Sequence, residues 1–100
     1  MDAQLKRGIL DACVLSIVNR EETYGYKLVV DAKDIIELSE STLYPILRRL
    51  EQSGYLETFT KEFQGRLRKY YKITPTGLKK LVEYKIDWLE MQRIYKAIFE

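Results

Sequence analysis

The chain has 100 residues, of which 46% are apolar and 32% are charged, and its formal net charge is +2; this length and composition predict one folded domain and exclude a chain that is disordered by composition. The lack of histidine excludes histidine-based catalytic triads and imidazole metal sites, and the lone Cys13 excludes an internal disulfide and a cysteine-cluster zinc site. The longest apolar run, residues 9–18, contains Asp11 and is too short to cross a bilayer, so we expect no membrane partner. The single cysteine is typical of a reducing compartment, so we expect a cytoplasmic protein. We also expect no cofactor.

The small net charge hides an uneven distribution of charged residues. Residues 1–60 carry seven Lys or Arg and ten Asp or Glu (net −3), and residues 81–100 carry three and four (net −1). Residues 61–80 carry seven basic residues against one acidic residue (net +6). Such a basic segment indicates an anionic partner that meets one part of the chain; the alternative is a solvated loop that happens to be basic.

The first two elements are predicted to be helices. Apolar residues recur at helical spacing between residues 4 and 20, and they cover a face broad enough to be buried on more than one side. A polar connector follows, and Thr23 is a candidate N-cap for a shorter helix from about Tyr24 to Ala32. We expect Tyr24 and Tyr26 to pack within the domain.

A third helix is predicted from a buried stripe with spacings of three and four residues. The stripe consists of Leu43, Ile46, Leu47 and Leu50. Arg48 and Arg49 stand opposite it. Pro45 in the helix interior would remove one hydrogen bond and crowd the preceding turn, so the residues favour a helix start at Ser41 or Thr42.

The basic segment falls on a predicted β-hairpin. Residues 55–60 and 67–73 are rich in β-forming side chains that alternate in character, and residues 61–66 form the loop between them. The loop and the returning strand carry most of the bases. We expect one of Tyr70 and Tyr71 to be buried in the core and the other to lie on the surface.

The last predicted helix, residues 75–99, is too long to serve only as a cover for a domain of this size. Its apolar residues form two stripes on separate sides. The first is a heptad seam of Leu81, Tyr84, Trp88, Met91, Tyr95 and Ile98, and the second consists of Leu78, Val82, Ile86 and Leu89. We expect one face to pack on the domain and the aromatic seam to pair with a second copy of the chain. The alternative is that both faces are buried within one chain.

Three helices followed by a basic hairpin give the element order of a winged helix-turn-helix. We therefore predict a mainly α fold with a small β-hairpin, in which residues 1–74 form a DNA-binding domain and residues 75–100 form a dimerisation helix. The third helix would enter the major groove, where at most one of Arg48 and Arg49 reaches base edges, and the hairpin would meet the phosphate backbone. The predicted partner is double-stranded DNA, and the predicted contact residues are Ser41, Thr42, Tyr44, Arg48, Arg49, Gln64, Arg66, Arg68 and Lys69.

Three segments closely resemble the PadR family of bacterial regulators. They are the Tyr24-Gly25-Tyr26 motif, residues 38–54 and residues 68–77. The resemblance extends from Leu5 to about Trp88. It implies a winged-helix transcriptional repressor that dimerises through its first and last helices. It also implies a recognition helix that includes Pro45, contrary to the late start that the residues alone favour.

The short chain is similar to compact members of this family that bind drugs. That resemblance implies that Trp88 stacks on flat aromatic small molecules between two subunits, with Ile9, Tyr84 and Gln92 as its neighbours. The alternative role for Trp88 is plain packing in the dimer. The implied homodimer interface consists of Leu5, Ile9, Leu81, Tyr84, Trp88, Met91, Tyr95 and Ile98.

Two other functional classes compete with a DNA-binding repressor. An exposed aromatic seam also suits a winged-helix module that binds a protein or a small molecule and has little affinity for DNA. An enzyme is not predicted, because no nucleophile-and-base pair, phosphate-cradling glycine loop or paired-carboxylate motif stands out in the sequence.

Overall fold

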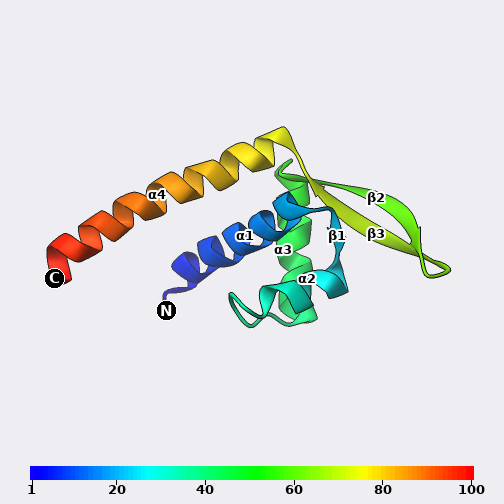
Figure 1. The fold of residues 1–100 in the computed structure, drawn as a ribbon, viewed down its shortest axis with the longest axis horizontal. Helices are drawn as coiled ribbons and strands as arrows, with labels where there is room; N and C mark the ends of the chain where they lie inside the picture. The colour runs from blue at the N-terminus through cyan, green and yellow to red at the C-terminus, as the bar shows by residue number, and fades with distance from the viewer.

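The computed structural model describes residues 1–100 as four helices and three strands (Figure 1). The sheet is antiparallel in the order β1-β3-β2. Helices and sheet together form a winged helix-turn-helix, which confirms the predicted fold class. In chain order the elements are α1 Ala3–Arg20, β1 Thr23–Tyr24, α2 Gly25–Ala32, α3 Glu40–Gln52, β2 Leu56–Phe63, β3 Arg66–Ile73 and α4 Pro75–Phe99.

The hydrophobic core lies between the first three helices and the inner face of the sheet. Helix α1 is buried along residues 10–18 apart from half-buried Ser16, as its broad apolar face predicts. The predicted stripe of α3 is also buried, and Leu43 and Leu47 are completely enclosed. Burial of these side chains is the main force that holds α1, α2 and α3 together, since apolar contacts supply most of the free energy of folding.

Helix α3 begins earlier than the residues alone favour. Ser39 is the N-cap, and its hydroxyl oxygen accepts a hydrogen bond from the backbone N–H of Thr42 at 3.3 Å. Pro45 therefore lies inside the helix, as the family resemblance implies. Proline leaves the carbonyl of Ser41 without its helical donor. Because Ser41 is exposed, that carbonyl is open to solvent and carries no penalty of an unpaired buried group, so the helix continues.

The prediction that Thr23 caps α2 is wrong. Thr23 belongs to β1, where it pairs with Tyr71 of β3, and its side chain is buried. Helix α2 begins one residue later, after Tyr24, without a side-chain cap. Pairing with the central strand β3 outweighs the local preference of threonine for the cap, since a ladder contact and burial stabilise more than one exposed hydrogen bond.

The hairpin, or wing, is longer than predicted. The ladder between β2 and β3 continues to the pair Phe63–Arg66, so only Gln64 and Gly65 form the turn. Both turn residues have positive φ, 52° and 78°, which matches the right-handed twist of the two strands. The expected loop of residues 61–66 is therefore mostly strand, and the basic side chains near its tip are held on a regular frame.

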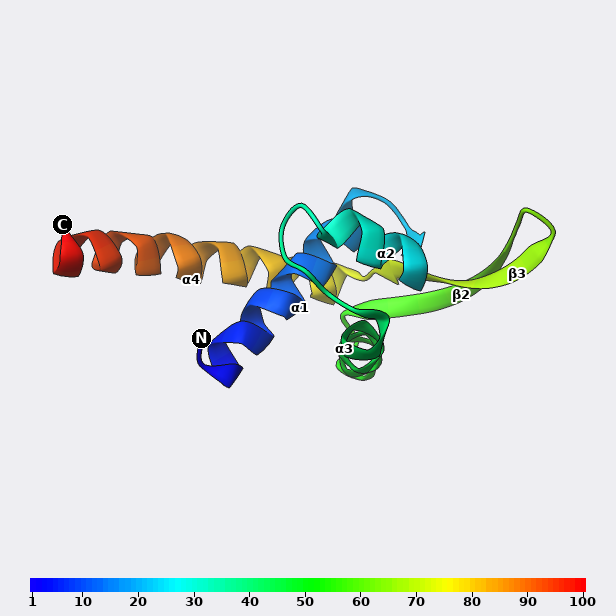
Figure 2. The same cartoon turned by 90° about the horizontal axis from the view of Figure 1, so that it is seen from below.

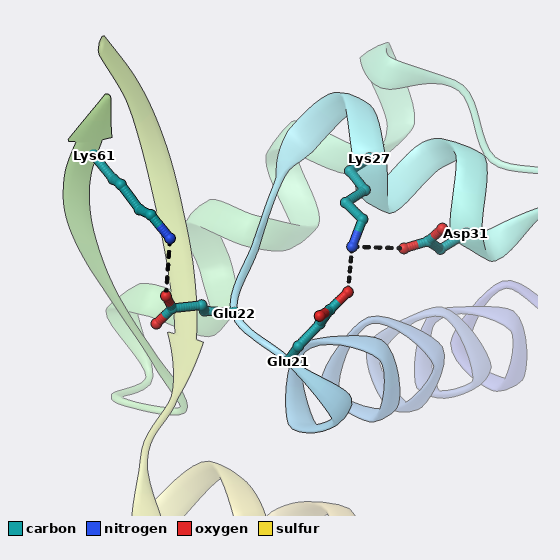
Figure 3. A network of polar contacts seen from close by, with 5 residues as sticks. All are labelled: Glu21, Glu22, Lys27, Asp31 and Lys61. Atoms are coloured by element: carbon teal, nitrogen blue, oxygen red, sulfur yellow. Dashed lines mark hydrogen bonds and ion pairs between the residues drawn. The ribbon is translucent and has the colours of Figure 1, made fainter. Parts of the chain in front are cut away.

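Ion pairs connect the segment between α1 and β1 to the wing and to α2 (Figure 3). Lys61 of β2 lies 3.5 Å from the carboxylate of Glu22, which follows α1. Lys27 of α2 pairs with Glu21 and lies 3.9 Å from Asp31. Exposed pairs of this kind contribute little to stability, so we regard the Lys61–Glu22 pair as orienting the wing rather than holding the fold together.

Helix α4 extends from the domain on the side opposite the wing (Figures 1 and 2), and the molecule measures 54 × 26 × 20 Å. Thr74 caps its first turn, where the backbone N–H of Gly77 donates to the Thr74 hydroxyl at 3.0 Å, and Pro75 occupies the first helical position. The helix has 25 residues, yet none of the helices combines the length and apolar character that a bilayer crossing requires.

The prediction that one face of α4 packs on the domain while the aromatic seam stays free for a second copy is wrong in one respect. Leu81 and Tyr84, the first two residues of the aromatic seam, pack against the core of their own domain. The second stripe remains between 44 and 60% exposed. Past Trp88 both stripes are uncovered, because α1 is shorter than α4 and the seam runs beyond its reach.

Candidate nucleic-acid interface

One exposed row of side chains runs along α3. Ser41, Tyr44 and Arg48 follow one another at spacings of three and four residues, which places them on one face of the helix. All three are exposed, and the opposite side of α3 is buried in the core. This face presents a hydroxyl, a phenol and a guanidinium, three groups that bind base edges or phosphates.

Hydroxyl groups gather at the exposed N-terminus of α3. The Ser39 hydroxyl lies 3.0 Å from that of Ser41 and donates to the Thr42 hydroxyl at 3.1 Å. Because the Thr42 oxygen accepts this bond, its own proton stays available to a ligand. The predicted contact residues Ser41 and Thr42 thus belong to one ordered cluster at the end of α3, which favours anions.

Arg49 is directed away from this exposed row. Its guanidinium Nη2 donates to Oδ1 of Asp11 on α1, and its side chain is 29% exposed. The Asp11 side chain is 11% exposed. Burial raises the pKa of the Asp11 carboxyl more than the neighbouring Arg49 lowers it. The prediction that Arg49 stands exposed opposite the buried stripe is therefore wrong, whereas Arg48 is exposed and stays a candidate for DNA contact.

A small hollow of about 200 Å³ joins the start of α2, the face of α3 and the wing. Arg68 and Lys69 of β3 supply its positive charge, and Tyr44 supplies a hydroxyl from α3. Its remaining walls are Tyr24, Gly25, Tyr26 and Tyr71. The hollow brings predicted contact residues from two separate elements, α3 and the wing, to one place.

Sequence reasoning missed Tyr26 as part of this surface. It predicts that Tyr26 packs within the domain, whereas the side chain is 60% exposed and lines the hollow. An eight-residue helix offers few covered positions, and those of α2 are occupied by Leu28 and Ala32. The Tyr24-Gly25-Tyr26 motif, which carries part of the family resemblance, is the signal that marks this region in the sequence.

Gly25 allows the side chain of Tyr44 to lie against the start of α2. A Cβ atom on residue 25 would be 2.6 Å from the Tyr44 hydroxyl and 3.0 Å from its ring. These distances are below van der Waals contact, but the obstructing atoms are the end of a side chain that can rotate. Any residue larger than glycine at position 25 therefore displaces Tyr44.

Gly25→Ala is expected to lower duplex affinity about 5-fold while changing the free energy of unfolding by less than about 1 kcal/mol. Alanine displaces the Tyr44 hydroxyl from this hollow, where we expect it to bind DNA, and one hydrogen bond is worth roughly 1 kcal/mol. Tyr44→Phe removes the same hydroxyl and should give the same loss. The double variant should lose nothing further in a fluorescence-anisotropy titration, and additive losses would contradict this coupling.

The wing carries the remaining predicted contact residues in different environments. Gln64 and Arg66 are exposed at the tip, whereas the Arg68 guanidinium lies 4.7 Å from the ring centre of Tyr24. The Lys69 ammonium lies 3.7 Å from Glu51 of α3, which ties the wing to the recognition helix. The stacking of Arg68 on Tyr24 fixes the guanidinium in place while leaving its charge available.

Both tyrosines of β3 are buried, so the expectation that one of them lies on the surface is wrong. Tyr71 belongs to the core. Tyr70 lies on the outer face of the sheet, where Tyr24 and Phe59 cover it at ring-centre distances of 5.4 and 5.6 Å. Lys61, which the sequence reasoning did not single out, lies 5.2 Å from the ring centre of Tyr70. A small aromatic cluster thus stiffens the outer side of the wing.

A second, larger hollow of about 610 Å³ runs between α1 and α4. Four residues that the sequence connects with a ligand, Ile9, Tyr84, Trp88 and Gln92, all line it. Lys85 is the only charged side chain in its wall. Cys13 also lines it, and burial raises the pKa of that thiol, so the group is protonated near neutral pH.

Comparison with known proteins identifies relatives of the chain. The profile of the transcriptional regulator PadR-like family matches residues 14–83. A PadR family transcriptional regulator from Eggerthella lenta is 38% identical, with a TM-score of 0.85 over 97% of this chain and 87% of that one. A PadR-like transcriptional regulator from Bacillus cereus is 34% identical, with a TM-score of 0.86 over 98% of both chains. A transcriptional regulator of Mycobacterium tuberculosis is 44% identical over 56 residues, which are 56% of this chain and 52% of that relative.

Proposed function

Because the chain belongs to the PadR-like family of DNA-binding transcriptional regulators, and is therefore not an enzyme, we propose that it is a homodimeric repressor that binds a two-fold-related operator in the cytoplasm. The observation that supports this proposal best is the hollow shared by α2, α3 and the wing, because it brings Tyr44 of the exposed row beside Arg68 and Lys69 of the basic segment. Cations beside hydroxyl groups on one face suit the phosphates and base edges of a duplex.

The DNA-contacting residues divide into two groups in this proposal. Ser41, Thr42, Tyr44 and Arg48 of α3 meet base edges and adjacent phosphates in the major groove. Gln64, Arg66, Arg68 and Lys69 of the wing meet the phosphate backbone, where they add affinity without reading sequence. Arg49 does not belong to either group, because Asp11 holds its guanidinium inside the domain.

A second copy of the chain covers the free part of α4 in this proposal, with residues 75–100 as the dimerisation element. Beyond Trp88 every residue of the helix is exposed, and several of them are large and apolar. Apolar surface of this extent is typical of a protein interface. The proposed interface comprises Leu5 and Ile9 of α1 with Leu81, Tyr84, Trp88, Met91, Tyr95 and Ile98 of α4. Static light scattering should give the mass of two chains, and a monomeric mass would favour a module that binds another protein.

The operator itself can be found by a direct binding experiment. In an electrophoretic mobility shift, the protein should prefer duplex DNA from the region upstream of its own gene over random duplex at about 0.15 M salt, by about 1000-fold or more. A scrambled duplex of the same base composition is the control. Equal affinity for the two duplexes would reject the repressor.

The hollow between α1 and α4 supports a further part of the proposal, in which a small ligand binds there and releases the repressor from DNA. Its wall is mainly apolar, and Trp88 offers a flat ring beside Tyr84, with 5.9 Å between the ring centres. A planar aromatic compound would bury its faces there. Titration with a planar dye should quench the fluorescence of Trp88, the only tryptophan, and Trp88→Phe should lose the signal. Unchanged emission at saturating dye would leave Trp88 with a packing role only.

A further inference from the structure

The ion pair between Asp11 and Arg49 connects the reading helix to the body that the dimer would use. Asp11 lies on α1 and Arg49 on the last turn of α3, which lies across α1 (Figure 1). Asp11 is the only charged residue in the buried interior. None of the DNA-contacting groups proposed above includes either side chain, so the pair requires an explanation of its own.

Stability is a weak explanation for this pair. A buried ion pair loses hydration on both partners, and an apolar pair of similar size would often stabilise the fold as well or better. Burial raises the pKa of the Asp11 carboxyl despite the adjacent Arg49, which shows that the loss of hydration is large here. The pair differs from an apolar contact in one useful respect, because a hydrogen bond to a carboxylate has direction.

Glu51 connects α3 to the wing through the Thr58 hydroxyl, which donates to it at 3.2 Å, and through Lys69. The other contacts of α3 with the helical body lack the direction that the Asp11–Arg49 pair supplies. Its buried stripe is built from leucine and isoleucine, and apolar contacts of this kind allow small rotations at little cost. Arg49 is eight residues, or roughly 12 Å, from Ser41 along the helix. A rotation of about 10° around the Arg49 end would move Ser41 by roughly 2 Å, which is more than half of the roughly 3.4 Å between stacked base pairs.

Helix α4 is also close to this pair. Leu81 and Tyr84 of α4 pack on the core, and a Cβ atom on Gly8 of α1 would be 3.8 Å from the Tyr84 ring. After burial, Asp11 also contributes to the raised pKa of the Tyr84 hydroxyl. Helix α4 therefore packs on the part of α1 that carries Asp11, so the two helices that would form the dimer and the one that would read DNA come together in this region.

We propose that Asp11 and Arg49 are positioning residues that fix α3 relative to α1 and α4, and so set the distance between the two operator half-sites that a dimer accepts. The inference rests on the proposed function, because spacing has meaning only for a two-fold operator. In each protomer the directional contact fixes the angle of α3 relative to α1. Because the two protomers of a dimer are related by symmetry, this angle determines the distance between the two copies of α3, and so the spacing of the half-sites that they bind.

The test uses the full chain and an operator that the wild-type protein selects from random duplexes. Moving the selected half-sites together or apart by one base pair should lower wild-type affinity about 10-fold or more. The double variant Asp11→Leu/Arg49→Met replaces the pair by apolar side chains. It should keep the base preference within each half-site while its spacing penalty falls to about 3-fold or less. A spacing penalty equal to that of the wild type would overturn the inference.

Two further variants make this test decisive. Arg49→Lys keeps the charge but loses the guanidinium geometry, so it should give an intermediate penalty, and it decides the question if the double variant is not folded and dimeric. Glu21→Gln removes the charge from an exposed pair with Lys27, outside the proposed DNA contacts and the proposed dimer interface, and should keep the wild-type penalty. Equal relaxation in Glu21→Gln would contradict the role of Asp11 and Arg49. A wild-type protein that selects no duplex would instead reject the proposed function, and the inference with it.

Discussion

Replacing Arg66, Arg68 and Lys69 together by glutamine is expected to weaken duplex binding about 100-fold at about 0.15 M salt. Each cation that neutralises a phosphate releases a counterion and adds roughly 0.9 to the slope of log affinity against log salt. Loss of three such contacts should therefore lower the slope by about three, for specific and random duplexes alike. Fluorescence-anisotropy titrations at a series of salt concentrations measure both quantities.

The control for this experiment changes the same net charge elsewhere. Lys6, Arg20 and Lys33 are exposed outside the wing and outside the proposed dimer interface, and glutamine at these three positions leaves the wing intact. That variant should keep the wild-type salt slope. An equal loss in both variants would mean that overall charge, and not the wing, governs binding. Glutamine is preferred to alanine at position 68 because the longer side chain continues to cover the ring of Tyr24.

Gly77→Ala is expected to lower the free energy of unfolding by about 2–3 kcal/mol, because α4 enters the domain at a point with no room for a side chain. A Cβ atom there would lie 2.1 Å from the carbonyl oxygen of Tyr55 and 2.8 Å from Ile73. The Tyr55 carbonyl also accepts the backbone N–H of Thr74 at 3.1 Å, so it cannot move aside without loss of that bond. Urea denaturation followed by circular dichroism measures the change in the free energy of unfolding. A thermal scan should give a melting temperature roughly 10–20 °C lower than that of the wild type.

Gly8→Ala provides a matched control for this effect. A Cβ atom on Gly8 would be 3.8 Å from the Tyr84 ring, which is ordinary contact, and the residue lies inside α1. Alanine favours a helix over glycine by up to about 1 kcal/mol, so this variant should be as stable as the wild type or more stable. Destabilisation by both substitutions, or by neither, would contradict the account of how α4 is attached.

The architecture is predictable from the sequence because its main elements are strongly periodic. The leucine stripe of α3 repeats at three and four residues, the hairpin strands alternate, and Thr74-Pro75 marks the start of α4. These are local signals, and tertiary contacts agree with them. The start of α3 is an exception, since the cap at Ser39 and hydration of an exposed carbonyl make Pro45 tolerable within the helix.

Other features depend on residues that are distant in the chain. Thr23 joins a strand because Tyr71, 48 positions later, offers a ladder partner. The partner of Arg49 is Asp11, 38 positions earlier, and no local pattern predicts that pair. The two stripes of α4 look alike in the sequence, so the spacing alone does not reveal which residues face α1. The exposed position of Tyr26 has the same origin, because it depends on how α2 packs on its neighbours.

The most direct test of a dimer that reads a two-fold operator is the mass of its complex with DNA. Size-exclusion chromatography with light scattering, at about 0.15 M salt, should give two chains per duplex carrying both half-sites. A duplex with one half-site scrambled should bind at least about 10-fold more weakly. One chain per duplex, or equal affinity for the intact and the half-scrambled duplex, would contradict the account.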